Sequence, residues 1–274
     1  MENLNSKISS ANRFSKEPII SIIVPALNEE KHLAECLESL IHQKGNIPYE
    51  IIVVDNGSED KTPQIAQNKN VKLVIEPIQG LTQARQAGFN ASKGKIIAYI
   101  DADSIAPDDW ILSIQETFRQ YPDAVGLCGL YRFVLKSKVH RALFWFYFNL
   151  VEKMITKFLG GQRFAGTNFA VCRSSLEKIG GFNLKVVFYG EDVDLATRLK
   201  KIGKIYPFNS IVVSSGRRFD EKGILIPGFI YLFNYLWLLL FKKPIFNFYD
   251  KPENNAETQK ETNAVPPSLA EKET

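Results

Sequence analysis

Acidic residues recur in this sequence where predicted strands end. Asp101 and Asp103 follow the apolar run IIAYI, Asp55 ends the run EIIVV, and Glu29 follows the run IISIIVP. Two carboxylates spaced as Asp-Ala-Asp on a turn can reach one hard divalent cation of the kind that accompanies phosphate groups. Taken singly, an Asp-x-Asp pair is common in surface turns, Asp55 fits a strand-ending cap, and Glu29 fits a solvated acid. Their shared position favours a site for a metal ion and a phosphate group.

A second acidic group opens a predicted helix. The segment EDVDLATRLKKI begins with Glu191, Asp192 and Asp194, ends in basic residues, and is followed by Gly203. The helix dipole favours acids in a first turn, which is the ordinary explanation for all three. Asp194, two residues beyond Asp192, points elsewhere on the helix and is expected to be structural.

The elements that must position these acids follow from the hydrophobic pattern. Short, nearly continuous apolar runs predict strands at Ile19–Pro25, Tyr49–Asp55, Val71–Glu76 and Lys95–Asp101. Helical patterns lie between and after them, at Leu33–Ile41, Thr62–Asn68, Gly80–Ser92 and beyond Pro107. Such alternation predicts an α/β fold with a mostly parallel sheet flanked by helices. Ligands of these sheets bind at the carboxyl ends of the strands, where the acids lie.

The second half of the sequence is less regular. An aromatic-rich helix is predicted at Arg141–Leu159, a strand at Gly166–Cys172, and helices at Ser174–Ile179 and Glu191–Ile202. The segment after residue 250 is polar and without aromatics beyond that point, so disorder is expected there.

Composition limits the class of protein. The chain has 274 residues, of which 45% are hydrophobic and 23% charged, as in globular proteins. A net charge of +4 is too small to favour nucleic acid as a partner. Six acids and three lysines give residues 250–274 a charge of −3, which leaves +7 for the rest. Three cysteines without a CxxC pair exclude a disulfide framework and suit a reducing compartment. The polar lead MENLNSKISSANRFSKE has no secretory signal pattern.

Five motifs occur in order: SIIVPALNEE, IIVVDNGSEDKT, GLTQARQAG, IIAYIDADS, and GGFN with GEDVDLATRL. This series resembles the family-2 glycosyltransferases of the GT-A fold and spans Ser21 to Gly203. The resemblance implies an inverting enzyme that uses a nucleoside-diphosphate sugar and a divalent metal, Mg²⁺ or Mn²⁺. No QxxRW motif follows, the signature associated with processive polymer synthases, so transfer of a single sugar is expected.

The resemblance also implies roles for residues at the donor site. The base and ribose would be held by Pro25, Ala26, Leu27, Glu29 and Asp55. Arg85 lies where the family contacts the nucleotide, with an ordinary surface arginine as the alternative. Asp101 and Ala102 would lie near the ribose, and Asp103 on the metal that bridges the diphosphate, where the metal improves the leaving group.

On the acceptor side, Glu191 and Asp192 match the Glu-Asp pair of the family. The aspartate of that pair is the expected general base, which takes the proton of the attacking hydroxyl group.

One departure from the family pattern concerns the third metal ligand. None of His32, His42 and His140 lies in Ser214–Phe219, where many GT-A enzymes supply a metal-binding histidine; SSGRRF stands there. Either Asp103 and the diphosphate hold the metal alone, or Arg217 and Arg218 neutralise part of the diphosphate charge. A basic loop near a membrane surface is the alternative for the two arginines.

The uncharged run Ile224–Phe241 raises the question of a membrane. Its 18 residues reach the length of a membrane-spanning helix. Basic residues flank it on both sides, and an enzyme that uses nucleotide sugars is expected to face the cytoplasm. Both points favour an apolar helix that lies in the interface or is re-entrant, with burial against Arg141–Leu159 as the alternative. We therefore expect peripheral or monotopic attachment at the cytoplasmic face of the membrane, with a soluble cytoplasmic protein as the second choice.

These observations combine into one expected organisation. Residues 1–18 form a flexible lead, 19–215 a GT-A domain, 216–249 a membrane-associating segment that includes the C-terminal apolar helix, and 250–274 a disordered tail. The acceptor is expected to be a glycan or lipid-linked molecule near the membrane, in the synthesis of cell-envelope polysaccharide. One alternative is a non-catalytic nucleotide-sugar-binding or membrane scaffold protein. Another is a nucleotidyltransferase, which would want a Gly-rich basic loop where the acidic ALNEE stands.

Overall fold

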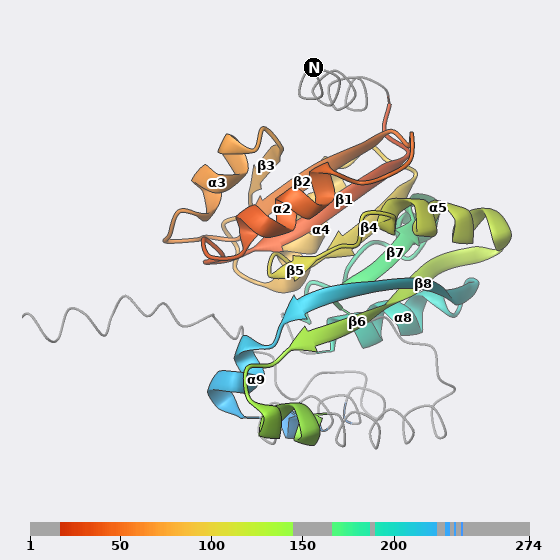
Figure 1. Cartoon of the computed structure of the whole chain (residues 1–274). Coiled ribbons are helices and arrows are strands. Elements are labelled where there is room, and N and C mark those ends of the chain that lie inside the picture. Colours follow the sequence, from red (N-terminus) through yellow and green to blue (C-terminus); the bar gives the residue numbers. More distant parts are fainter. Residues whose placement is uncertain are drawn as a thin grey trace, which may run out of the picture.

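A single mixed sheet organises the described part of the chain. The computed structural model describes residues 17–144, 166–186 and 190–223, together with 228–230, 233 and 237. Within them, eight strands pair in the order β3-β2-β1-β4-β7-β6-β8-β5 (Figure 1). The strands are β1 Ile20–Ala26, β2 Tyr49–Asp55, β3 Lys72–Ile75, β4 Ile96–Ile100, β5 Ser104–Ile105, β6 Ala124–Val134, β7 Asn168–Cys172 and β8 Lys204–Ser215.

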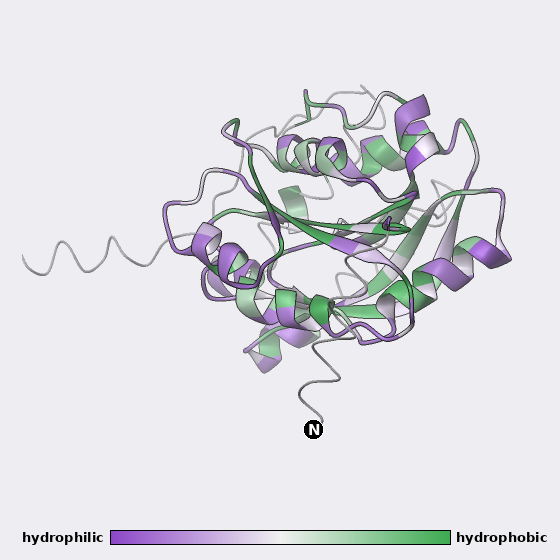
Figure 2. Cartoon of the chain, turned by 90° about the horizontal axis from the view of Figure 1, so that it is seen from above, coloured by the Kyte–Doolittle hydropathy of each residue, from purple (hydrophilic) through white to green (hydrophobic). Residues whose placement is uncertain are grey.

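Helices cover both faces of this sheet. They are α2 Leu33–Ile41, α3 Thr62–Asn68, α4 Leu81–Ala91, α5 Trp110–Gln120, α7 Arg173–Lys178, α8 Glu191–Leu199 and α9 Arg217–Lys222, and residues 138–144 are also helical. Residues of α2, α3 and α5 pack with one face of the central strands, and residues of α4, α7 and α8 with the other. The hydropathy colouring follows this layering, since the central strands are largely hydrophobic and the outer helices carry hydrophilic residues (Figure 2).

The predicted parallel strands are confirmed. β1 pairs in parallel with β2 and β4, and β2 with β3. Alternate residues of each strand face opposite layers, so Ile22 and Ile23 of β1 belong to different cores. Such runs are apolar on both faces because helices cover both.

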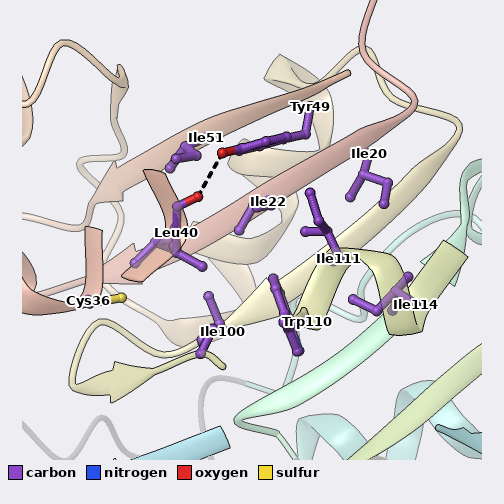
Figure 3. Close-up of a cluster of buried hydrophobic side chains, with 14 of the residues drawn as sticks. Ile20, Ile22, Cys36, Leu40, Tyr49, Ile51, Ile100, Trp110, Ile111 and Ile114 are labelled. Carbon is purple, nitrogen blue, oxygen red and sulfur yellow. Dashed lines mark hydrogen bonds between the residues drawn. The ribbon is translucent and has the colours of Figure 1, made fainter. Parts of the chain in front are cut away.

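The larger core lies between the strands, α2 and α5. Ile20, Ile22, Ile51 and Ile100 meet Trp110 and Ile111 there, and the Tyr49 hydroxyl crosses the layer to donate a hydrogen bond to the Leu40 carbonyl at 2.9 Å (Figure 3). A buried tyrosine needs such a partner, because an unpaired hydroxyl in an apolar core is costly.

The second half of the sheet departs from the parallel pattern. β7 runs antiparallel to both β4 and β6, and β5 antiparallel to β8, while β6 and β8 are parallel. The 11-residue strand β6 is absent from the strands predicted above. Gly126 and Gly129 interrupt its apolar run, and its pairing with β8 is irregular around both, so no clean alternation marks it.

Several predictions fall on residues outside the described set. Residues 1–16 and 238–274 lie outside it, and of the helix predicted at Arg141–Leu159 only residues 141–144 are described, as helix. Within Ile224–Phe241, residues 228–230, 233 and 237 are helical, and Phe229 stacks on Phe233 at 5.6 Å. No helix among the described residues is long and apolar enough to cross a membrane. The apolar helix as a whole therefore stays a prediction.

Candidate active site

The predicted donor loops meet at the carboxyl ends of β1 and β2. Ala26 is the register partner of Asp55, and the Asn56 amide donates to the Ala26 carbonyl at 2.9 Å. Pro25 and Ala26 end β1, and the side chains of Ala26 and Leu27 are buried, so the loop offers its backbone to a ligand. The buried Asp55 carboxylate accepts from the Ser58 amide at 3.4 Å.

Hydrogen bonds from the second loop hold the first. The Asn28 amide donates to the Ser58 hydroxyl at 2.9 Å, and the Glu29 amide to the Thr62 hydroxyl at 2.8 Å. The buried side-chain amide of Asn56 connects these two loops to a third one. It donates to the carbonyls of Glu76 and Ile78 and accepts from the backbone amide of Gly80. The sequence pattern assigned no role to Asn56, whose hydrogen bonds hold these loops together.

The acids of the Asp-x-Asp pair lie immediately beyond β4. Ala102 between them is buried, the Ser214 hydroxyl of β8 donates to Asp103 Oδ1 at 3.3 Å, and the Ser215 amide donates to the Asp103 carbonyl at 3.1 Å. β8 thereby fixes the turn that presents both carboxylates.

Arg217 binds two of the predicted acids. Its guanidinium makes a bidentate contact with the buried Glu29 carboxylate, with the Nη1–Oε2 distance at 2.9 Å, and its Nη2 lies 3.7 Å from Asp103 Oδ2. Arg217 is the first residue of α9, which follows β8 directly. Arg218 also makes interactions in the structure, and its positive charge acts on Asp101.

Arg85 joins the two acidic groups of the sequence. Its side chain is only 1% exposed; Nη1 donates to Glu191 Oε1 at 2.9 Å, Nη2 donates to the Gly166 carbonyl at 2.7 Å, and Nη2 lies 3.7 Å from Asp101 Oδ1. The guanidinium also lies over the Phe169 ring. The surface-arginine alternative is therefore wrong, because α4 packs this residue into the interior.

Asp192 lies beside this arginine on the first turn of α8. A Cβ atom added to Gly166 would lie 3.2 Å from Glu191 Oε1, 3.5 Å from Arg85 Nη2 and 3.9 Å from Asp192 Oδ2. Gly166 therefore borders all three groups, a position that the sequence did not reveal. Asp194 instead accepts from Arg198 at 2.8 Å and from Asn183 at 3.2 Å, which agrees with a structural role.

The site is crowded with carboxylates. Burial raises the pKa of Glu191 to about 8, and the charge of Asp192 adds to the rise, against the attraction of Arg85. Burial likewise raises the pKa of Glu29 to about 7 and of Asp101 to about 6, with Asp103 adding to both, although the arginines oppose these shifts. The raised pKa values mean that burial, together with repulsion between the carboxylates, outweighs the positive charge of the two bridging arginines.

That electrostatic shortage fits a divalent cation. Asp103 and Asp101 are oxygen donors on one turn, and Mg²⁺ in proteins commonly takes one or two carboxylates, with phosphate and water oxygens completing its shell. Among the described residues no group of three His, Cys, Asp or Glu side chains has the arrangement of a metal site. The donors present therefore fit a metal ion that arrives with a diphosphate better than one held by protein alone.

Comparisons with known proteins find relatives among the glycosyltransferases. Glycosyltransferase GlyG of Streptococcus pneumoniae is 28% identical over 214 residues, which cover 76% of this chain and 64% of that protein. The beta-monoglucosyldiacylglycerol synthase of Trichormus variabilis is 28% identical over 66% of this chain and 41% of that protein. Glycosyltransferase AglE of Haloferax volcanii matches at 36% identity over 34% of this chain, and the chain spans only 33% of its length.

Solved structures show the same fold. The glucosyl-3-phosphoglycerate synthase of Mycobacterium tuberculosis, solved with Mn²⁺, uridine diphosphate and glucosyl-3-phosphoglycerate, superposes with a TM-score of 0.58 over 86% of this chain and 82% of that one, at 20% identity. TarS of S. aureus gives a TM-score of 0.53 over 80% of this chain and 43% of that one, at 18% identity. The mixed sheet with helices on both faces thus confirms the predicted GT-A fold class. The profile of the family described as Glycosyl transferase family 2 matches residues 21–180. The chain is therefore a member of glycosyl transferase family 2.

Proposed function

We propose that this chain is an inverting glycosyltransferase that moves one sugar from a nucleoside-diphosphate sugar to an acceptor hydroxyl group. The acceptor oxygen forms a bond to C1 of the sugar as the bond from C1 to the diphosphate breaks. Asp192 takes the hydroxyl proton, and the nucleoside diphosphate leaves with the bonding electron pair. The observation that carries this proposal is the Arg85 bridge, which brings Asp101 on the donor side and Glu191, next to Asp192, to one guanidinium.

The donor would lie across the carboxyl ends of β1, β2 and β4. In this proposal the backbone of Pro25–Leu27 and the Asp55 carboxylate hold the base and ribose, with Glu29 and Ala102 lining the same region. Asp101 would lie toward the ribose and Asp103 would hold a divalent metal ion, which when bound would offset the negative charge of the leaving diphosphate.

For Arg85 we propose a positioning role in place of a contact with the nucleotide. Its buried contacts with protein groups support a residue that positions Asp101 and Glu191, not one that lies open to the nucleotide. For Arg217, the ion pair with Glu29 and the approach to Asp103 support a position beside the diphosphate, where a guanidinium can add positive charge. Arg218 would assist from the same turn.

We further propose an acceptor at or near the cytoplasmic face of a membrane, which the chain reaches by peripheral or monotopic attachment. One relative is a synthase of a glucosylated diacylglycerol, which supports a lipid or lipid-linked acceptor. The domain organisation expected from the sequence, with a membrane-associating segment at residues 216–249, belongs to the same proposal.

The test of donor and metal binding is thermal unfolding with uridine diphosphate and Mn²⁺. Ligand that binds only the folded chain raises its melting temperature by mass action. We expect uridine diphosphate with Mn²⁺ to raise it more than either alone, and Asp103→Ala to lose the Mn²⁺-dependent part. Asp123→Ala, an exposed acid at the far end of β6, is the matched control. An unchanged Mn²⁺ effect in Asp103→Ala would remove Asp103 from the metal site.

The test of the base is a transfer assay with a panel of nucleoside-diphosphate sugars. Asp192→Asn should lose transfer almost completely and keep the thermal shift with uridine diphosphate and Mn²⁺. Asp194→Asn, two residues away and paired with Arg198, should keep transfer. Full transfer by Asp192→Asn would exclude Asp192 as the base.

A further inference from the structure

The end of β6 and the helix that follows it carry an unusual set of exposed side chains. Residues 130–144 contain no acid, and among them Lys136, Lys138, Val139, Arg141 and Leu143 are exposed. We refer to these five residues as the docking face. Val139 is 66% exposed and Leu143 46% exposed, high fractions for aliphatic side chains. Within the described parts of the chain, none of the three basic residues is held in an ion pair.

The helical geometry of residues 138–144 separates this face from a packed one. Phe144 contacts Phe133 of β6 and Phe219 of α9, with ring centroids 5.5 and 5.0 Å apart, and His140 Nδ1 lies 3.3 Å from Asp220 Oδ1. At 100° per residue, these two positions define the inner side. The opposite side centres on Ala142, with Lys138 and Arg141 on one flank and Val139 and Leu143 on the other. Basic and aliphatic side chains therefore lie next to one another on the exposed side of this helix.

This helix is coupled to the active site through α9. The two helical segments lie side by side at one end of the molecule (Figure 1). α9 begins with Arg217, which binds Glu29 and approaches Asp103. α9 thus contacts the helix at residues 138–144 through Phe219 and the carboxylates of the donor site through Arg217.

We propose that the docking face binds an anionic lipid bilayer and orients the active site toward an acceptor there. The proposal rests on the glycosyltransferase function above and gives its membrane contact a location outside Ile224–Phe241. Basic side chains attract the negative surface of a bilayer, and adjacent aliphatic side chains enter its interface. A nucleic acid would engage the charges but leave Val139 and Leu143 in water, so a bilayer fits the combination better. The exposed Phe229, 62% accessible and seven residues beyond the end of α9, adds an apolar side chain in the same half of the chain.

The experiment is co-sedimentation of the full chain with phospholipid vesicles. Vesicles with about 30% phosphatidylglycerol are compared with pure phosphatidylcholine, at low and high salt. We expect binding to the anionic vesicles that weakens at high salt. The charge reversal Lys138→Glu with Arg141→Glu should lower the partition coefficient at least about tenfold. Val139→Ser with Leu143→Ser should lower it at both salt concentrations.

Matched controls separate the surface from net charge and from folding. Lys93→Glu with Lys95→Glu makes the same charge change at exposed positions just before the central strand β4 and should lower binding far less. Each variant is checked by its melting temperature and by its thermal shift with uridine diphosphate and Mn²⁺. Retained shifts with lost vesicle binding support the docking face independently of the donor site.

Three results would overturn the proposal. The first is that the full chain does not bind anionic vesicles. The second is that the charge-reversed variant binds as well as the original chain, and the third is that the control pair loses as much vesicle binding as the charge-reversed variant. Preferential binding of a nucleic acid over anionic vesicles, or self-association through the same residues, would replace the bilayer with that partner. Loss of the thermal shift in the original chain would instead count against the donor site.

Discussion

Arg85 is the residue on which both acidic groups of the site depend. Its buried guanidinium forms ion pairs with Glu191 and Asp101 and donates a hydrogen bond to the Gly166 carbonyl. Arg85→Met should therefore destabilise the chain by about 3 kcal/mol, because removing one partner leaves buried carboxyl and carbonyl groups without their donor. Urea unfolding measures this loss. Arg119→Met, at an exposed position of α5, should change stability by less than about 0.5 kcal/mol. Equal effects of the two variants would contradict a buried bridge.

The raised pKa of Glu191 predicts a pH dependence with a definite sign. A folded-state pKa of about 8, against an ordinary value of 4.5, means that the folded chain holds a proton that the unfolded chain releases between these two values. The corresponding stability is complete below about pH 4.5 and is lost as the pH rises through about 8. Glu191→Gln, which resembles the protonated acid, should thus gain stability relative to the original chain as the pH rises from about 5 to about 8, and the difference should level off above that. A difference that stays constant over this range would rule out the raised pKa.

The Arg217–Glu29 pair shows what sequence can and cannot provide at this scale. Glu29 and Asp103 were predicted at one edge because both follow parallel strands, and the parallel pairing is confirmed. Their arginine partner comes from a residue 188 positions away from Glu29. Its location depends on how β8 pairs with β5 and β6, which no local pattern records. The sequence thus indicated which charged residues lie near the site, but not which of them form ion pairs with one another.

At the scale of elements, helix α4 packs closely on β1 and β2. A Cβ atom at Gly88 would lie 2.4 Å from Ile23 Cγ2 and 3.1 Å from Val54 Cγ2. Gly88→Ala should therefore destabilise the chain by about 1–3 kcal/mol through overpacking, although alanine is the better helix former. Thermal or urea unfolding checks this. Asn90→Ala, at an exposed position of the same helix, changes the helix propensity without overpacking and removes one exposed hydrogen bond from Gln86, so it should be close to neutral. A stabilised Gly88→Ala would show that the helix can move away from the sheet.

The strands differ in how clearly their sequences predict them. β1, β2 and β4 are buried on both faces and read as continuous apolar runs, so their bounds were predicted to within one or two residues. β6 is buried over Ala124–Leu127 and alternates with exposed residues from Leu130 on. Ala124, Val125 and Leu127 of its first half belong to the two cores, whereas the residues of its second half belong to neither. A strand whose burial changes along its length has no single periodicity, which is why this one was not predicted.

At the scale of the whole molecule, every strand of the described sheet lies between residues 20 and 215. We therefore expect a chain that ends at Gly223 to unfold cooperatively, with a melting temperature close to that of the full chain. It should keep the shift with uridine diphosphate and Mn²⁺. If the docking face is sufficient for attachment, the shortened chain should also keep salt-sensitive binding to anionic vesicles. Complete loss of vesicle binding would assign attachment to residues 224–274 instead.

The chain of charges from Glu29 through Arg217, Asp103, Asp101 and Arg85 to Glu191 has a consequence for solution conditions. A divalent metal ion bound at Asp103 would favour the ionised form of the carboxyl groups nearest to it, so Glu29 and Asp101, whose pKa values are raised, should release protons when the metal ion binds together with the donor. Near neutral pH the binding heat would then depend on the ionisation enthalpy of the buffer. Calorimetry in phosphate-free buffers of different ionisation enthalpy would count the protons released, and identical heats in all of them would mean that the carboxyl groups do not respond. The affinity for the metal ion and donor would accordingly rise with pH until Glu29 and Asp101 are ionised, near pH 7, so the acidity of its surroundings would help to set how much donor this protein holds.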